Sequence, residues 1–455
     1  MHIAKKLFII LPIFVFAVCV GYFFACNRNN TVYSDSDYVT IANHFKSKKN
    51  VDREIVFLKK ALSVNPYNFT VAKRLGFLYY ELDDDCKAFD YFKKAYELNN
   101  KAKDCLYYIG YIAYHKMYDE QTAIKAMSEF IEYDKNNVNS YIVLHDCYMK
   151  RHEFEKARQQ DDKKDALLIK KGIFQKLPKH WDGQDPRGKT ILLRDNVGIG
   201  DLFCWLRYAK QLKKVGARVA LHVRPYLIPI LSKCPYIDEL VGRDKPLPYF
   251  DYQFPVGQTP YFFVSSVNAL RFDGPYMYAD ERLTALWKKK LAKDKSFKVG
   301  ICWDPCVYKK KDGSIMKNRR AIPLSFFRPL SKVKNVSFYS LQRVNGTEQA
   351  KKSGFPLYVF GDEFDKEHGS FSDTAAVMKN LDLVITTDTS VAHLAGALGI
   401  PVWTLIPFVP DWRWTIQEGK TPMYSTMRLF RQKKLDDWEQ VMSELYCEFL
   451  ALVKK

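Results

Sequence analysis

Two loops of the chain carry the residues best suited to chemistry, and the first of them is Asn196–Asp201. An apolar run over 190–193 precedes this loop, and an amphipathic segment over 202–215 follows it. Glycines at such a strand-to-helix turn let the backbone approach a ligand closely, and Asp201 at the start of the helix is placed to act in a cleft. The same position also suits a carboxylate that caps the helix N-terminus. The spacing therefore leaves Asp201 with a chemical and a structural interpretation.

The second loop, Thr386–His393, stands between a predicted strand and a predicted helix over 391–398. Backbone amides at a helix N-terminus, together with the hydroxyls of Thr389 and Ser390, suit a diphosphate. His393 follows about one helical turn further on, on a face that could look into the same cleft. These residues predict a site for a phosphate-bearing ligand.

A third motif, Gly183–Thr190, satisfies the pattern of a P-loop letter for letter. That loop needs a strand before it and a helix after it, so that backbone amides and the helix dipole hold the phosphates. No apolar strand precedes Gly183, and a strand rather than a helix follows Lys189. We therefore exclude a P-loop ATPase.

From Lys189 onward, short apolar runs alternate with helical segments, which is the pattern of an α/β fold. The runs that we interpret as buried parallel strands are 190–193, 219–223, 298–302, 336–341, 357–360, 383–386 and 402–405. They divide near Asp294 into two halves, 181–295 and 296–455. Two doubly wound, Rossmann-like halves with a cleft between them form an architecture that handles nucleotides.

A repeat of 34 to 35 residues precedes these halves. Leu75–Tyr79 matches Ile109–Ala113, and 144–148 follows at the same spacing. We interpret 38–165 as an α-solenoid of paired helices that resembles tetratricopeptide repeats. Neighbouring pairs bury one another's apolar faces and leave a concave groove. The groove could hold a partner protein or an acceptor, or the repeats could be a spacer that holds the next domain off a membrane.

The N-terminus predicts a transmembrane helix. An uncharged run from Leu7 to Ala25 is long enough, at about 1.5 Å per residue, to cross a hydrocarbon core. We expect a single-pass, uncleaved membrane anchor, and leave open the side of the membrane on which the rest of the chain lies. The net charge of +20 favours anionic partners. That charge is spread along the chain, without a basic tail or zinc-finger spacing, so we do not expect nucleic-acid binding.

Residues 181–440 resemble the family 9 glycosyltransferases, the heptosyltransferase-like group, and particularly bacterial proteins that join such a domain to tetratricopeptide repeats. The motifs that carry the resemblance are Trp181-x-Gly183, Gly188–Thr190, Gly198–Asp201, Gly216–Val219, Arg320–Leu324, Ser340–Gln342, Asp373–Ala376, Asp388–Gly399, Pro401–Trp403 and Pro410–Trp414. The resemblance implies a GT-B fold and an inverting, metal-independent transfer. A sugar would move from a nucleotide-diphosphate donor to a hydroxyl of a glycan, a lipid-linked saccharide or a protein.

The resemblance also implies roles for single residues. Asp201 would be the general base that deprotonates the acceptor hydroxyl. The residues that would hold the donor are Gly200, Arg319, Arg320, Gln342, Asp388, Thr389, Ser390 and His393. The two arginines would neutralise the leaving diphosphate, and neither a metal nor another cofactor is implied. The C-terminal helix, over 436–452, would return to pack across the N-terminal half.

One departure from the family's pattern is Asp304, which stands where small residues and an asparagine are common. An additional carboxylate beside a diphosphate is unfavourable if it points inward. A second hypothesis therefore stays open, in which the chain is a non-catalytic interaction protein. Its repeats would recruit a partner, and its degenerate GT-B half would bind a nucleotide sugar without turnover. Retention of Asp201, Asp388 and His393 argues against that hypothesis.

Overall fold

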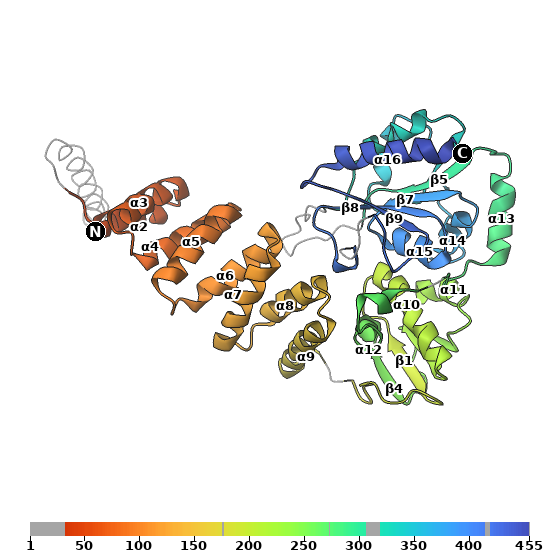
Figure 1. Cartoon of the computed structure of the whole chain (residues 1–455), viewed down its shortest axis with the longest axis horizontal. Coiled ribbons are helices and arrows are strands. Elements are labelled where there is room, and N and C mark those ends of the chain that lie inside the picture. The colour runs from red at the N-terminus through yellow and green to blue at the C-terminus, as the bar shows by residue number, and fades with distance from the viewer. Residues whose placement is uncertain (1–31, 175–176, 273, 306–318, 415–418, 455) are drawn as a thin grey trace, which may run out of the picture. The chain divides into compact units, whose positions relative to one another are not determined.

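The computed structural model describes residues 32–174, 177–272, 274–305, 319–414 and 419–454 (Figure 1). The chain divides into two compact units, Met1–Leu144 (unit 1) and His145–Lys455 (unit 2). The predicted membrane anchor, 7–25, lies outside the described residues. Within the described ranges, every helix is too short or too polar to cross a membrane.

Unit 1 is built of helix pairs that follow one another along the chain (Figure 1). Its helices are α2 (Asp35–Ser47), α3 (Val51–Val64), α4 (Phe69–Glu81), α5 (Asp85–Leu98), α6 (Lys103–Ile112) and α7 (Glu120–Tyr133). Within the pairs, α2 packs on α3, α4 on α5 and α6 on α7. A Cβ added at Gly76 would lie 2.8 Å from Phe92, and one at Gly110 would lie 2.8 Å from Met127. These glycines are the small residues that the repeat requires, so the predicted helical repeats are confirmed.

Two further helices, α8 (Val138–Lys150) and α9 (Phe154–Lys170), complete the helical part of the chain. The boundary between the units falls within α8, and α9 belongs to unit 2. Phe154 and Ala157 of α9 are buried in the core of unit 2. The last helical pair therefore contributes to the packing of the α/β unit.

Unit 2 contains two sheets in which neighbouring strands are parallel. The first has the order β3-β2-β1-β4, with β1 (Thr190–Arg194), β2 (Arg218–Val223), β3 (Glu239–Gly242) and β4 (Tyr252–Pro255). The second has the order β6-β5-β7-β8-β9, with β5 (Phe297–Cys302), β6 (Val336–Ser340), β7 (Leu383–Thr387), β8 (Val402–Ile406) and β9 (Met427–Arg431). The prediction of two α/β halves with parallel sheets is confirmed.

Helices lie between these strands and after the last one. They are α10 (Ile199–Lys214), α11 (Ile228–Leu231), α12 (Thr259–Phe263), α13 (Glu281–Leu291), α14 (Ser372–Met378), α15 (Ser390–Leu398) and α16 (Trp438–Val453). Short 3-10 turns lie at Pro225–Leu227, Val256–Gln258, Val267–Leu270, Leu324–Phe327, Leu330–Lys332, Thr347–Lys352 and Trp412–Trp414, and a π-helical turn in unit 1 at Ala113–Met117.

The predicted strand over 357–360 is wrong, and three short strands, β3, β4 and β9, escape prediction. In place of that strand, Tyr358 forms an isolated bridge with Tyr339. Tyr358 and Val359 are 54% and 52% exposed, and Pro356 has no N–H to donate to a ladder. A segment at an open sheet edge gains little from burial, although its residue types favour a strand.

The predicted return of the C-terminal helix to the N-terminal half is also wrong. Helix α16 buries Val441, Leu445 and Phe449, which share one helical face, in a cluster with Phe338 and Leu405 of the second sheet. The short connection after β9, over 432–437, leaves the chain beside its own half. The single apolar stripe of α16 is therefore covered by the nearest face of the second sheet.

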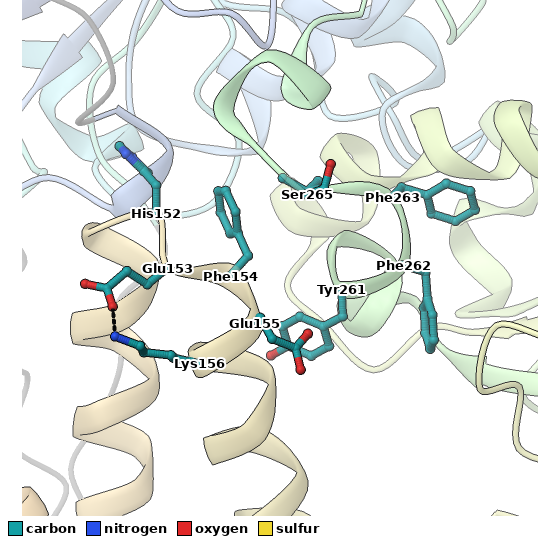
Figure 2. A pocket seen from close by; sticks show the side chains of 10 residues that line it. His152, Glu153, Phe154, Glu155, Lys156, Tyr261, Phe262, Phe263 and Ser265 are labelled. Atoms are coloured by element: carbon teal, nitrogen blue, oxygen red, sulfur yellow. Dashed lines mark hydrogen bonds and ion pairs between the residues drawn. The ribbon is translucent and has the colours of Figure 1, made fainter.

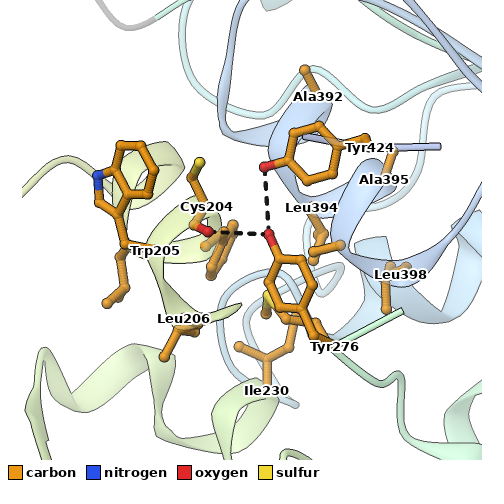
Figure 3. Packing of buried hydrophobic residues seen from close by; sticks show 14 of the residues in the cluster. Cys204, Trp205, Leu206, Ile230, Tyr276, Ala392, Leu394, Ala395, Leu398 and Tyr424 are labelled. Atoms are coloured by element: carbon orange, nitrogen blue, oxygen red, sulfur yellow. Dashed lines mark hydrogen bonds between the residues drawn. The ribbon is translucent and has the colours of Figure 1, made fainter. Parts of the chain in front are cut away.

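The two halves of unit 2 meet where α10 packs against α15 (Figure 3). Cys204 of α10, Ala395 of α15, Tyr276 and Tyr424 lie in the same buried cluster. A Cβ added at Gly200 would lie 2.9 Å from the Cδ2 atom of His393 and 3.5 Å from the Cα atom of Ser390. Because α10 follows β1 and α15 follows β7, this close approach brings the carboxyl ends of the two sheets together.

Candidate functional site

Asp201 lies in the first turn of α10 and faces the second half of unit 2. The N-cap of α10 is Gly198, and no side chain makes the capping hydrogen bond. The interpretation of Asp201 as a helix cap is therefore wrong. The Oδ1 atom of Asp201 instead lies 2.8 Å from the Nη2 atom of Arg413, and the Asp201 side chain remains 34% exposed. Solvent therefore still reaches this carboxylate at the junction of the two halves, and a ligand can reach it as well.

The loop that carries Asp201 is held by a buried ion pair. Arg224 donates from Nε to Asp195 Oδ2 at 2.7 Å and from Nη2 to Asp195 Oδ1 at 2.8 Å. The same Nη2 donates to the carbonyl oxygen of Val197 at 2.9 Å. Because this bidentate pairing fixes both the end of β1 and the following turn, the start of α10 has a defined position.

The second loop begins α15 with a hydroxyl cap. Thr389 is the N-cap, and its Oγ1 accepts a hydrogen bond from the Val391 N–H at 3.2 Å. The same hydroxyl lies 3.1 Å from Thr386 Oγ1. Thr389 and Ser390 are partly exposed, and the first turn of α15 holds no acidic residue. The positive end of the helix dipole thus reaches a surface from which an anion can approach.

His393 is buried at the same junction and is electrically neutral. Its Nδ1 atom lies 2.8 Å from the Tyr424 hydroxyl, and its ring stacks on Trp414 at 5.4 Å between centroids. Its Nε2 atom lies 3.9 Å from Asp388 Oδ1. Burial, and then the positive charges of Arg413, Arg207 and Arg320, hold the pKa of His393 well below its usual value. A neutral imidazole contributes hydrogen bonds to this site rather than charge.

Arg207 ties the two halves together beneath these residues. Its buried guanidinium donates to the carbonyl oxygens of Cys204 at 2.8 Å, Met423 at 2.9 Å and Leu270 at 3.3 Å, and to the Tyr276 hydroxyl at 3.1 Å. Met423 belongs to the second half, directly before Tyr424. Four acceptors for one buried cation stabilise the junction, and no described residue supplies Arg207 with a carboxylate partner.

The donor residues expected from the resemblance separate into two groups. Arg320 lies beside the second loop, where its Nη1 donates to the Asp388 carbonyl oxygen at 3.2 Å and lies 3.7 Å from Asp388 Oδ2. Arg319 precedes it in the same turn. The side chain of Gln342, in contrast, forms hydrogen bonds within its own half of unit 2. Its Oε1 accepts from the N–H groups of Trp303 at 3.0 Å and Asp304 at 2.9 Å, which positions the segment after β5.

Asp304, the departure from the family's pattern, lies against a glycine turn. A Cβ added at Gly346 would lie 2.8 Å from Asp304 Oδ2. Burial, and then the nearby charge of Glu348, raise the pKa of Asp304.

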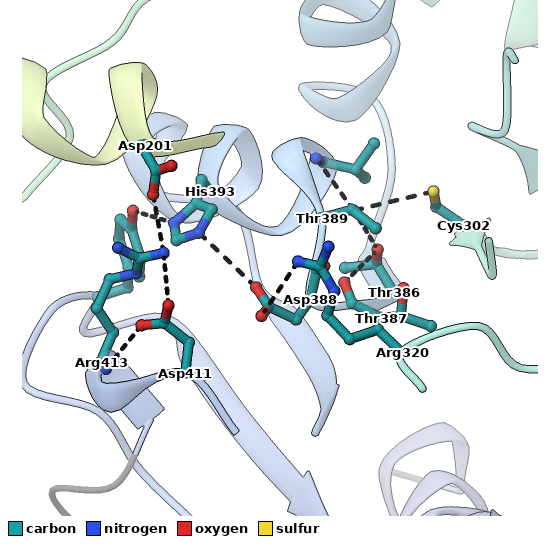
Figure 4. Close-up of polar contacts among 12 residues, drawn as sticks. Asp201, Cys302, Arg320, Thr386, Thr387, Asp388, Thr389, His393, Asp411 and Arg413 are labelled. Carbon is teal, nitrogen blue, oxygen red and sulfur yellow. Dashed lines mark hydrogen bonds and ion pairs between the residues drawn. The ribbon is translucent and has the colours of Figure 1, made fainter. Parts of the chain in front are cut away.

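Asp411 and Arg413 belong to the site, although no role for them follows from their sequence pattern (Figure 4). Arg413 Nη2 lies 3.3 Å from Asp411 Oδ2, in addition to its contact with Asp201, and the Arg413 N–H donates to Asp411 Oδ1 at 3.0 Å. The guanidinium also lies 5.4 Å from the centre of the Trp205 ring and 5.8 Å from that of Trp412. The signal in the sequence was Pro410–Trp414, where an acid, a base and two tryptophans stand within five residues.

A pocket of about 490 Å³ lies between the first turn of α9 and the segment 261–265 (Figure 2). Glu153 and Lys156 form an ion pair of 2.6 Å in its lining. Phe154, also in the lining, contacts Trp412 edge to face with 5.7 Å between ring centres. The pocket therefore neighbours the segment that carries Arg413 but is lined by none of the candidate site residues.

Unit 1 has a groove of its own, with a volume of about 660 Å³. Its charged and aromatic lining residues are Lys46, Lys49, Glu54, Phe69, Lys73, Arg74, Phe77 and Glu81. Arg74 pairs with Glu54 at 2.6 Å, and Lys46 and Lys49 are exposed. The groove joins aromatic side chains to an excess of positive charge.

No protein-family model matches the chain. Among curated proteins, the protein FlbA of Caulobacter vibrioides is 24% identical over 287 residues, which cover 58% of this chain and 47% of that protein. The chain thus spans about half the length of the curated relative that it matches.

Solved structures of two kinds are similar to the chain. A family 9 glycosyl transferase from Veillonella parvula shares 11% identity over 58% of this chain and 91% of its own, with a TM-score of 0.44. The ADP-heptose LPS heptosyltransferase II of E. coli shares 13% identity over 58% of this chain and 99% of its own, with a TM-score of 0.41. YrrB, a TPR protein with an unusual peptide-binding site, shares 18% identity over 34% of this chain and 85% of its own, with a TM-score of 0.27.

Proposed function

We propose that unit 2 is an inverting glycosyltransferase that moves a sugar from a nucleotide-diphosphate donor to a hydroxyl acceptor. The observation that carries the proposal is the junction of α10 and α15, where Asp201 of one half meets the N-terminus of α15 from the other. A partly exposed carboxylate can accept a proton, and a helix N-terminus with a nearby arginine can hold a diphosphate. Both groups are needed for this transfer, and they stand on opposite sides of one junction.

The proposed donor site is the N-terminal turn of α15 together with Arg320. Negative charge develops on the diphosphate as the bond to the sugar breaks. Fixed amide dipoles and a guanidinium stabilise this charge without reorganising. Thr389 and Ser390 lie at this turn, and Arg320 already contacts the loop through Asp388. We propose that these groups neutralise the leaving diphosphate without a metal ion.

The proposed base is Asp201. Its carboxylate accepts the proton of the acceptor hydroxyl while the hydroxyl oxygen forms a bond to the anomeric carbon of the donor sugar. The bond between that carbon and the diphosphate oxygen breaks, and its electron pair leaves with the nucleoside diphosphate. Attack from the face opposite the leaving group inverts the anomeric centre. The neutral ring of His393 would contribute a hydrogen bond on the donor side.

A donor screen tests this function. The purified full chain is incubated with a panel of nucleotide sugars, and both nucleoside diphosphate release and donor binding are measured, with and without EDTA. Asp201→Asn is expected to bind the same donor and to lose at least about 100-fold in turnover, the usual range for a general base. Asp185→Asn is the matched control, since Asp185 is an exposed residue in the segment before β1 and pairs with Arg187 at 2.7 Å. This control should retain turnover.

The outcomes separate the two hypotheses. Turnover that depends on Asp201 and persists in EDTA supports a metal-independent transferase and names its donor. Donor binding without turnover in the presence of every acceptor class would instead establish the non-catalytic, nucleotide-sugar-binding protein. Turnover that Asp201→Asn leaves unchanged contradicts the assignment of the base.

We propose that the groove of unit 1 holds a protein partner or the acceptor. Its exposed Lys46 and Lys49 favour an acidic ligand. The pair of substitutions Lys46→Glu and Lys49→Glu should then raise the acceptor concentration required for half-maximal turnover, with donor hydrolysis unchanged. An unchanged acceptor requirement would exclude the acceptor from the groove and leave a partner site or a spacer.

We propose that residues 7–25 anchor the chain in a membrane. The uncharged run and the lysines before it support this assignment. The full chain should sediment with membranes after a salt wash, whereas a chain that begins at residue 27 should not. Equal release of both forms would contradict an anchor.

A further inference from the structure

Arg413 is the cation at the centre of the junction, and its position is unusual for a residue that only joins two halves. Its side chain is 12% exposed and is shared between two carboxylates, at 2.8 Å from Asp201 and 3.3 Å from Asp411. The contact with Asp201 connects α10 of the first half to the segment before Trp414 of the second (Figure 4). The residue that holds the proposed base is thus a cation close to His393 of α15, beside the proposed donor site.

The guanidinium still has donor capacity. Both of its side-chain ion pairs use Nη2. Its Nε atom is buried and has no hydrogen-bond partner among the residues that the structure describes. The Nε and Nη2 atoms form one edge of the planar fork, and this edge matches two oxygens of a phosphate. A phosphate on this edge would satisfy Nε and would compete with Asp201 for Nη2.

The charges around the junction make such competition necessary. Three carboxylates, Asp201, Asp388 and Asp411, surround two arginines, Arg320 and Arg413, and both arginines already contact carboxylates. A diphosphate that binds here competes with these carboxylates for the two guanidinium groups.

We propose that Arg413 couples donor binding to the release of the base: it holds Asp201 while the site is empty and transfers to the donor's diphosphate when the donor binds. This inference rests on the proposed function of unit 2. While Arg413 Nη2 lies 2.8 Å from Asp201 Oδ1, the guanidinium occupies the oxygen that the acceptor hydroxyl would have to reach. Once the guanidinium contacts the diphosphate, Asp201 accepts the acceptor's proton as described above. Arg413 thus positions the base in the empty site and binds the diphosphate in the occupied one.

The proposal predicts that the loss of a catalytic carboxylate strengthens the binding of a ligand, which is unusual. Removing the charge of Asp201 should tighten the binding of a nucleoside diphosphate, because Arg413 no longer has to leave a competing partner. A simple structural role for Arg413 predicts no such gain. Repulsion between Asp201 and the diphosphate through space also predicts tightening, but this effect does not depend on Arg413.

A double-mutant cycle separates these explanations. Dissociation constants for a panel of nucleoside diphosphates are measured by titration calorimetry on the full chain. The four proteins are wild type, Asp201→Asn, Arg413→Gln and the double variant. We expect Asp201→Asn to bind about tenfold more tightly than wild type, which is about 1.4 kcal/mol. In the Arg413→Gln background the same change should alter affinity less than about twofold. Asp185→Asn, the remote carboxylate control, should bind as wild type does.

A second variant guards against loss of fold, since Arg413 is buried beside Trp205 and Trp412. Arg413→Lys keeps the positive charge but has no planar fork. The tightening caused by Asp201→Asn should fall by at least half in this background.

Each outcome decides something. Equal tightening in all backgrounds would indicate repulsion through space and would overturn the coupling, as would unchanged affinity in Asp201→Asn. Either result leaves the transferase function standing. If neither wild type nor Asp201→Asn binds any nucleoside diphosphate, the proposed function fails and the coupling fails with it.

Discussion

Gly200 offers the most direct test of the junction between α10 and α15. It lies within a helix at a φ that alanine adopts readily, so Gly200→Ala introduces no backbone strain. The added Cβ would lie 2.9 Å from His393 Cδ2 and 3.6 Å from the Ser390 backbone nitrogen. Since carbon atoms prefer separations of about 3.5–4.0 Å, the two helices must move apart by roughly 0.6 Å or more.

The structure gives the size of the effect. His393 cannot turn away easily, because it is buried, hydrogen-bonded to Tyr424 and stacked on Trp414. Overpacking of this kind costs about 1–3 kcal/mol, and alanine in place of glycine returns up to about 1 kcal/mol of helix propensity. The net loss of stability is therefore about 0–3 kcal/mol. Displacement of a catalytic group by about 1 Å can cost about 100-fold in rate, so we expect activity to fall much more than stability.

Two measurements on the full chain check this expectation: thermal unfolding of unit 2, and donor turnover with the donor that the screen identifies. Lys214→Ala, an exposed change in the last turn of the same helix, is the control and should leave both unchanged. In a His393→Ala background, the stability cost of Gly200→Ala should disappear, because the ring that blocks the methyl group is gone. A Gly200→Ala protein with undiminished turnover and a raised melting temperature would refute the close approach of the helices.

Other predictions concern the core of each unit. In unit 1, Gly76→Ala should lower the free energy of unfolding by about 1–3 kcal/mol, whereas Gly110→Ala should lower it by less than about 1 kcal/mol, because the ring of Phe92 is rigid and Met127 is flexible. Urea unfolding of the two variants compares them, and equal losses would contradict this reasoning. In unit 2, burial raises the pKa of Asp365 to about 6, against the opposing hydrogen bonds from Thr374. The folded state favours the protonated form, so this contribution to stability is complete below about pH 4 and is lost as pH rises through about 6. The free energy of unfolding at pH 4 and at pH 7 should therefore differ by up to about 3 kcal/mol less in Asp365→Asn than in wild type. If the two proteins show the same difference, Asp365 is not the source of this pH dependence.

Local sequence patterns were sufficient for most of the architecture. The 34-residue spacing of Gly76 and Gly110 predicts the helix pairs, because a small residue is required at each place where paired helices approach. The apolar runs that become β1, β2, β5, β6, β7 and β8 are buried on both faces of parallel sheets, so their composition alone identifies them. Three of the four edge strands did not follow this rule, since β3, β4 and β9 lack a long apolar run, and the run over 357–360 forms only an isolated bridge beside the edge strand β6.

The candidate site also has features that local sequence predicts and features that depend on packing. Gly198–Asp201 and Asp388–His393 stand out in the sequence because a glycine turn and a hydroxyl cap are local devices, set by neighbouring residues. Whether Asp201 caps its helix or faces the other half is not a local matter, and only the packing of α10 on α15 decided it. Gln342 was expected to hold the donor, but its hydrogen bonds to Trp303 and Asp304 depend on the pairing of β5 with β6.

The sequence by itself determined the order of the parts, the helical repeats, the two parallel halves and the two loops that bear chemical groups. The tertiary structure decided which charges meet. Arg413 lies more than two hundred residues from Asp201 along the chain, and their 2.8 Å contact exists because α10 and α15 pack closely at Gly200. Periodicity and spacing report interactions over one or two turns, whereas an ion pair between distant segments depends on how whole elements pack.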